Sequence, residues 1–162
     1  MIRGLRAVGD GYPILVKINS TDGFAGEGYL TLADVVTAVR GLVEWGVNAV
    51  EVSGGHREAR GVMSRPAVMA PEQEAYFAEA ARALKAAVDV PVILVGGLRS
   101  LSVMEHVVAT GAADLVALSR PLICERDLVN RLRAGEAKAV CSSCNACFNL
   151  AGLRCRRPDT SS

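Results

Sequence analysis

Cysteine thiols are the most concentrated reactive groups in this sequence. Four of the five cysteines gather near the C-terminus: Cys141, Cys144, Cys147 and Cys155. The fifth, Cys124, stands apart from them. Closely spaced thiolates can converge on one ion, and four of them suit either zinc or an iron–sulfur centre. Reduced thiols, partly buried as small hydrophobes, are the alternative, and the uneven distribution argues against a secreted disulfide scaffold.

Two loops carry residues that suit phosphate binding. Gly96 and Gly97 follow one apolar run of the sequence. Ser119 and Arg120 follow the next run, and each loop precedes a predicted helix. Backbone N–H groups in such loops can close on a phosphate, and a guanidinium adds a charge-assisted hydrogen bond. The pattern predicts a phosphate site, with a simple tight turn beside a surface arginine as the alternative.

Three further polar residues have side chains that could take part in chemistry. Lys17 ends an apolar strand, where a cation needs a partner such as an anionic part of a cofactor or a carboxylate. Its alternative is to extend from the strand end to water. His56 follows a glycine pair and could act as a base or donor, although a single loop histidine is more often structural. His106 falls inside a predicted helix, and no catalytic residue is assigned.

The elements that must position these residues follow from hydrophobic periodicity. Apolar runs predict strands over residues 12–19, 47–52, 91–95 and 114–118. Helical spacing predicts helices over residues 32–45, 71–87, 101–110 and 121–133, with Thr31 and Ser100 as N-caps. Alternating strands and helices give a parallel sheet whose strands end at one edge. The polar residues expected to meet at that edge are Lys17, Asn19, Ser53, His56, Gly96, Gly97, Ser119 and Arg120.

Composition bounds the class of protein. The chain has 162 residues, 51% hydrophobic and 22% charged, which predicts a globular domain. Eighteen basic against 17 acidic residues give a net charge of +1, so the sequence predicts no nucleic-acid partner and no binding to an anionic membrane surface. The apolar runs are too short to span a bilayer and the first residues do not resemble a signal peptide, so we expect a cytoplasmic protein.

Five motifs in their order along the chain resemble one family. They are YPILVKIN (12–19), GVNAVEVSGG (46–55), PVILVGG (91–97), ADLVALSRPLI (113–123) and CSSCNAC (141–147). Together they resemble the C-terminal half of the old yellow enzyme family of NADH:flavin oxidoreductases, in its dienoyl-CoA reductase-like branch. The resemblance implies an α/β fold, a (β/α)4 half of a TIM barrel made of the family's strands five to eight. Residues 1–135 would form this FMN-binding half barrel with its C-terminal helix, and residues 136–162 a Cys-rich tail.

The resemblance also implies a cofactor and a reaction. Members of the family bind FMN and pass a hydride from NAD(P)H to an activated alkene, a quinone or a similar small electron acceptor. Lys17 is similar to the residue at the flavin pyrimidine edge that stabilises the negative charge of the reduced ring. Gly96 and Gly97, with Ser119 and Arg120, resemble the FMN phosphate loops. The cysteine tail is similar to the segment that binds a [4Fe–4S] cluster, with shorter gaps, and zinc is the other expectation.

The family's substrate-binding residues lie on strands one to four, which have no counterpart in these motifs. The resemblance therefore implies a half barrel that needs a second copy of itself or a complementing N-terminal half. Two other functions stay open from the residues themselves. One is a phosphate-binding barrel isomerase or synthase, and the other is a non-catalytic flavin- or metal-binding fragment.

Overall fold

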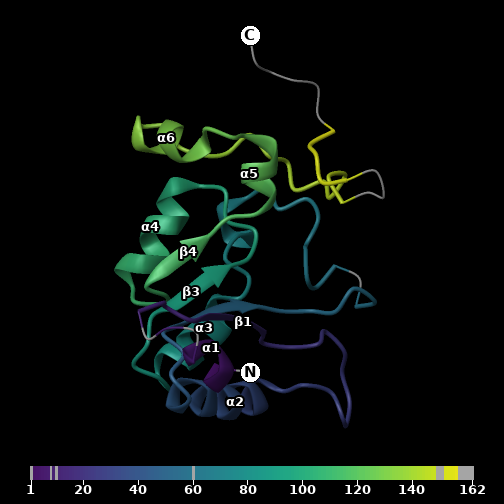
Figure 1. Cartoon of the computed structure of the whole chain (residues 1–162). Helices are drawn as coiled ribbons and strands as arrows, with labels where there is room; N and C mark the ends of the chain where they lie inside the picture. The colour runs from purple at the N-terminus through teal and green to yellow at the C-terminus, as the bar shows by residue number, and fades with distance from the viewer. Residues whose placement is uncertain (1, 8, 10, 60, 149–151, 157–162) are drawn as a thin grey trace.

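A four-stranded parallel sheet organises the chain (Figure 1). The structure is a computed structural model that describes residues 2–7, 9, 11–59, 61–148 and 152–156. The strands are β1 (Leu15–Asn19), β2 (Ala49–Ser53), β3 (Val92–Val95) and β4 (Leu115–Ala117). They pair in the order β1-β2-β3-β4, as half of a TIM barrel requires. This confirms the predicted fold class.

Helices alternate with the strands. They are α1 (Ile2–Arg6), α2 (Leu32–Glu44), the short 3₁₀ helix η1 (Pro71–Gln73), α3 (Ala78–Lys85), α4 (Leu101–Ala109), α5 (Arg120–Cys124) and α6 (Leu128–Arg133). The prediction of Thr31 as an N-cap is confirmed, because its hydroxyl accepts from the amide of Asp34 and the Asp34 carboxylate accepts from the amide of Thr31. Within the described residues, no helix combines the length and the apolar character needed to cross a membrane.

Two predicted helices are interrupted, each at a buried glutamate. The helix expected over residues 71–87 is η1 followed by α3, and Glu74 between them has an extended backbone (φ −75°, ψ 171°). The helix expected over residues 121–133 is α5 followed by α6, and Glu125 between them is also extended (φ −136°, ψ 98°). Both carboxylates bind backbone amides of distant segments, so long-range hydrogen bonds override the helical periodicity.

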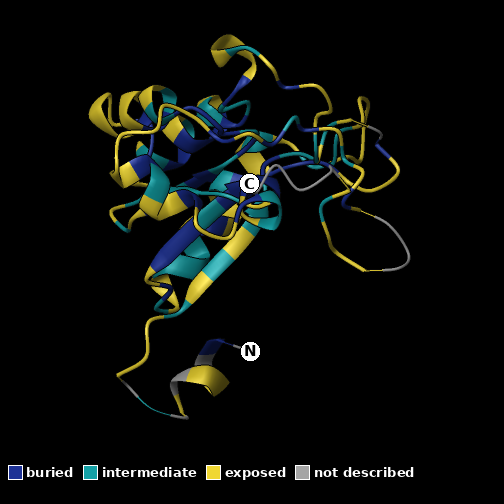
Figure 2. Ribbon diagram, turned by 90° about the horizontal axis from the view of Figure 1, so that it is seen from above, coloured by how far each residue is buried: buried dark blue, intermediate teal, exposed yellow. Residues whose placement is uncertain are grey.

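One face of the sheet is packed and the other is open. Val50, Val52, Val92 and Leu94 point to the packed face and are fully buried against residues of α2, α3 and α4. The alternate residues of the strands face the other way, and at the two edge strands Leu15 and Leu115 are 57% and 53% exposed. Figure 2 shows the buried residues gathered where the helices meet the strands. Among the described residues, helices therefore cover one side of the sheet and leave the other uncovered.

Gly97→Ala is expected to destabilise the fold more than Gly111→Ala. Both glycines have left-handed backbones (φ 69° and 68°), so both substitutions cost about 1–2 kcal/mol of backbone strain. A Cβ at Gly97 would lie 2.6 Å from the Tyr76 ring, whereas a Cβ at Gly111 meets nothing within 4 Å. Overpacking at Gly97 adds about 1–3 kcal/mol. Chemical denaturation of both variants measures the difference, and equal losses would contradict the close approach of Tyr76.

Candidate functional site

A cavity of about 310 Å³ opens at the carboxyl ends of the strands. Seven of the eight residues that were expected to meet at this edge line it: Lys17, Asn19, Ser53, Gly96, Gly97, Ser119 and Arg120. His56 is not among the lining residues, so its predicted place in the group is wrong. Its amide instead donates to the Asp22 carbonyl, and its ring lies 6.5 Å from that of Phe24, because the loop after β2 folds back on the loop after β1.

Glu74 holds the loop that follows β3. Its buried carboxylate accepts from the amides of Arg99 (2.7 Å) and Ser100 (2.9 Å), and from the Ser100 hydroxyl (2.7 Å). Ser100 is the N-cap residue of α4, as predicted, but its side chain makes no capping hydrogen bond, because its hydroxyl donates to the Glu74 carboxylate from a distant segment. The loop amides left for a phosphate are those of Gly96, Gly97 and Leu98.

Arg99 lies buried between two segments that wall the cavity. One terminal nitrogen, Nη1, donates to the Val68 carbonyl (2.6 Å), and the other, Nη2, to the Ala139 carbonyl (3.3 Å). Among the described residues, its Nε is the buried side-chain polar atom without a hydrogen-bond partner. A buried donor left unpaired is costly unless a ligand or water completes it. Arg99 also lines the cavity, but this Nε atom is itself buried from solvent.

Arg120 is a buried, anchored cation and not the surface arginine of the alternative interpretation. It is 6% exposed. Its Nη1 donates to the carbonyls of Arg65 (2.8 Å) and Ser143 (3.3 Å) and to Oδ1 of Asn145 (2.6 Å). Asn145 is itself fixed, since its Nδ2 donates to the Ser64 carbonyl. A ligand in the cavity would therefore be held by the Nε and Nη2 atoms of Arg120.

Lys17 has a carboxylate partner within the sheet. Its Nζ forms an ion pair with Glu51, the residue opposite it in the β1–β2 register. Its side chain is 57% exposed and lines the cavity, so the pair lies at a wet edge where Coulomb attraction alone contributes little. The ammonium is thus positioned beside the cavity by its neighbour in β2.

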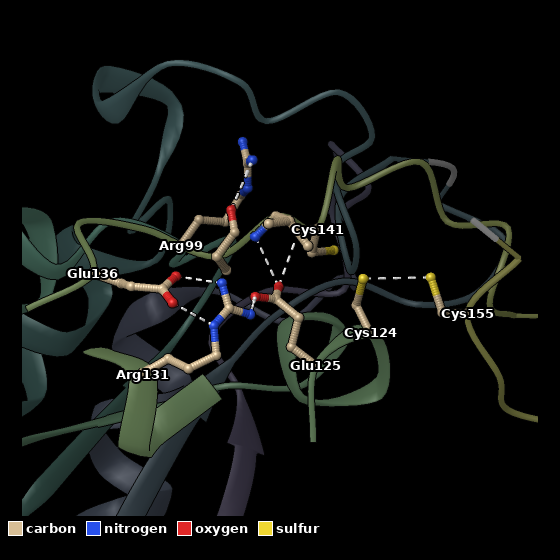
Figure 3. A network of polar contacts seen from close by, with 9 residues as sticks. Arg99, Cys124, Glu125, Arg131, Glu136, Cys141 and Cys155 are labelled. Carbon is tan, nitrogen blue, oxygen red and sulfur yellow. Dashed lines mark hydrogen bonds and ion pairs between the residues drawn. The ribbon is translucent and has the colours of Figure 1, made fainter. Parts of the chain in front are cut away.

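The Cys-rich tail packs against the barrel half. Glu125 accepts from the amides of Val140 (2.8 Å) and Cys141 (3.2 Å) through Oε1, and from Arg131 (2.7 Å) through Oε2 (Figure 3). The Ala139 amide donates to the Arg99 carbonyl, so the tail also runs beside the loop after β3. These bonds fix the course of residues 137–141, which lead to Ser143 at the cavity.

The four tail cysteines do not form a metal centre as they are placed. In the part of the chain that the structure describes, no three His, Cys, Asp or Glu side chains gather as metal ligands. Cys141 and Cys147 are buried while Cys144 is exposed, and Cys155 lies beside Cys124 instead. Burial raises the pKa of the Cys124 thiol to about 12 and raises the pKa of Cys147. Among the described residues, the four tail thiols are thus not gathered as one set of ligands for the predicted cluster or zinc site.

Comparisons with known proteins agree with this fold. Residues 6–139 match the NADH:flavin oxidoreductase / NADH oxidase family. An NADH oxidase of Thermoanaerobacter brockii is 34% identical over 141 residues, which is 86% of this chain and 21% of that protein. A metal reductase of Desulforamulus reducens is 29% identical over 86% of this chain and 20% of its own length.

A third relative is a bilirubin reductase of Mediterraneibacter gnavus, 28% identical over 74% of this chain and 19% of that protein. The chain thus spans about a fifth of the length of these curated relatives. The family match covers the four strands, the helices between them and the lining residues of the cavity other than Ser143 and Phe148. On these grounds the chain belongs to the NADH:flavin oxidoreductase / NADH oxidase family.

Proposed function

We propose that this chain is the phosphate-binding half of an FMN-dependent NAD(P)H:flavin oxidoreductase. The observation that supports this most is the cavity that gathers the glycine pair, Arg120 and Lys17 at one edge of the sheet. An anion-binding loop, a buried guanidinium and an ammonium at one cavity suit a ligand with a phosphate at one end and a ring that becomes negative on reduction.

The residues present fit the phosphate end of FMN. Gly96 and Gly97 carry no side chains of their own, and the Tyr76 ring packs where a Cβ of Gly97 would lie. In this assignment the loop amides and Arg120 hold the phosphate.

Lys17 would act at the ring end of the same ligand. Its ammonium, oriented by Glu51, supplies positive charge beside the flavin pyrimidine edge, where negative charge develops on reduction. Bound FMN would supply hydride chemistry, accepting from NAD(P)H and donating to a small acceptor such as an activated alkene or a quinone. The side chains that bind the acceptor are not assigned in this chain.

The open face of the sheet supports completion by a partner. In the part of the chain that the structure describes, β1 and β4 are each paired on one side, and apolar residues of both face away from the helices. An uncovered apolar face with two free strand edges favours association. We infer that a second copy or a complementing N-terminal half closes the barrel, and light scattering after size exclusion distinguishes a homo-oligomer from a monomer that awaits another chain.

The purified chain tests the assignment through its colour and its stability. FMN binding predicts the visible absorption bands of oxidised flavin, and added FMN should raise the unfolding temperature in a concentration-dependent way. A colourless protein that FMN does not stabilise would contradict the proposal. Stabilisation by a sugar phosphate without FMN would favour a phosphate-binding isomerase or synthase instead.

Arg120→Ala is expected to weaken FMN binding by about 1.5–3 kcal/mol, the scale of a charged hydrogen bond, or roughly 10- to 150-fold in Kd. Arg133→Ala is the matched control, because Arg133 is exposed on α6 and outside the cavity. Isothermal titration of FMN measures both affinities, and circular dichroism checks that the variants are folded. Unchanged affinity in folded Arg120→Ala would overturn the phosphate assignment.

Lys17→Met is expected to make the midpoint potential of bound FMN more negative. Loss of the ammonium removes stabilisation of the reduced ring and leaves the Glu51 carboxylate without its partner. A change of about 1.4 kcal/mol corresponds to about 30 mV for a two-electron couple. Lys85→Met is the control, since Lys85 pairs with Asp114 at the other end of the strands. Equal potentials for wild type and Lys17→Met would contradict the role of Lys17.

A further inference from the structure

Two thiols from segments far apart in the sequence meet beside α5. The Sγ atoms of Cys155 and Cys124 lie 3.5 Å apart (Figure 3). Cys124 is the last residue of α5, and Cys155 follows it by 31 positions, beyond α6 and most of the tail. A disulfide has an S–S length of about 2.05 Å, so about 1.5 Å of approach would join the two sulfurs.

Both thiols are reachable by a small reagent. Cys124 and Cys155 are each half-buried, in contrast to the buried Cys141 and Cys147. The segment that carries Cys155 is neither helix nor strand, so its sulfur can approach Cys124 without breaking a regular element. The exposed Cys144 provides an internal comparison, because it is more accessible but is not the sulfur that lies against Cys124.

We propose that Cys124 and Cys155 form a dithiol site that a small-molecule disulfide oxidises to an intramolecular disulfide. In the first step one of the two sulfurs, as thiolate, attacks a sulfur of the small disulfide, whose S–S bond breaks and releases one thiol. In the second step the other cysteine gives up its proton and displaces the remaining small thiol. The protein loses two hydrogens and two electrons, and one disulfide becomes two thiols.

The crosslink would fasten the tail to the wall of the cavity. Arg120, the first residue of α5, already binds Ser143 and Asn145 of the tail through hydrogen bonds. A covalent bond at the last residue of the same helix would hold the tail there even when those hydrogen bonds open. This use of Cys155 also removes it from the set of metal ligands that the sequence predicts.

Incubation of the purified, reduced full-length chain with glutathione disulfide tests the proposal. Acid quenching, alkylation and peptide mapping should find one crosslink, between Cys124 and Cys155, and two fewer alkylated thiols. Cys144→Ser, the matched control, should keep this crosslink. Cys124→Ser and Cys155→Ser should each lose the crosslink and carry a glutathione adduct on the remaining cysteine of the pair. The two variants thus test the same pair from both sides.

Three outcomes would overturn the proposal. One is that all cysteines stay reduced or are only glutathionylated in the wild type. Another is that crosslinks form among Cys141, Cys144 and Cys147 in preference to the proposed pair. The third is that a crosslink to Cys124 persists at the same level in Cys155→Ser. The measurement detects a covalent bond and needs no flavin. Its result therefore tests the dithiol site independently of the proposed FMN site.

Discussion

The arrangement of the candidate site depends on two buried carboxylates that bind backbone amides of distant segments. Glu74 takes the amides at the start of α4, and Glu125 takes those of Val140 and Cys141. A buried carboxylate without donors would be very costly, and each charged hydrogen bond contributes about 1.5–3 kcal/mol. Each glutamate ends a short helix because satisfying its carboxylate outweighs continuing the helix.

These two contacts decide what the cavity walls are made of. Glu74 fixes the loop after β3. The glycine pair in that loop is thereby held at the same cavity as the ends of β1 and β4. Glu125 fixes the tail, which then reaches Arg120 through Ser143 and Asn145. The tail thereby adds Ser143 and Phe148 to the lining of the cavity and helps to bury Arg120. The same tail brings Cys155 to the end of α5.

Features that depend on local pattern could be predicted from the sequence. Four strands, their parallel order and the meeting of Lys17, Gly97 and Arg120 at one edge all follow from alternating periodicities and from residues at strand ends. Contacts between distant segments could not be predicted in this way. The sequence pattern places Glu74 in the first turns of a helix, where acidic residues are common. Nothing in the spacing indicates that its carboxylate binds the amides of Arg99 and Ser100.

The tail shows the same limit more sharply. Spacing grouped four cysteines into one ligand set, whereas hydrogen bonds from Glu125 and Arg120 hold the tail, and Cys155 lies beside Cys124. Cys124, which spacing set aside, is the sulfur that Cys155 meets. His56 was likewise placed by its position after a strand, while its loop turns away toward Asp22. Each error arose where long-range hydrogen bonds outweighed sequence proximity.

The central claim is that this chain binds the phosphate end of a flavin nucleotide. Parallel calorimetric titrations of the same preparation with FMN and with riboflavin, which lacks the phosphate, test it most directly. The account predicts that FMN binds at least about tenfold more tightly, because the charged hydrogen bonds of the phosphate are worth about 1.5–3 kcal/mol or more. Equal affinities for the two ligands, or no binding of FMN, would contradict it.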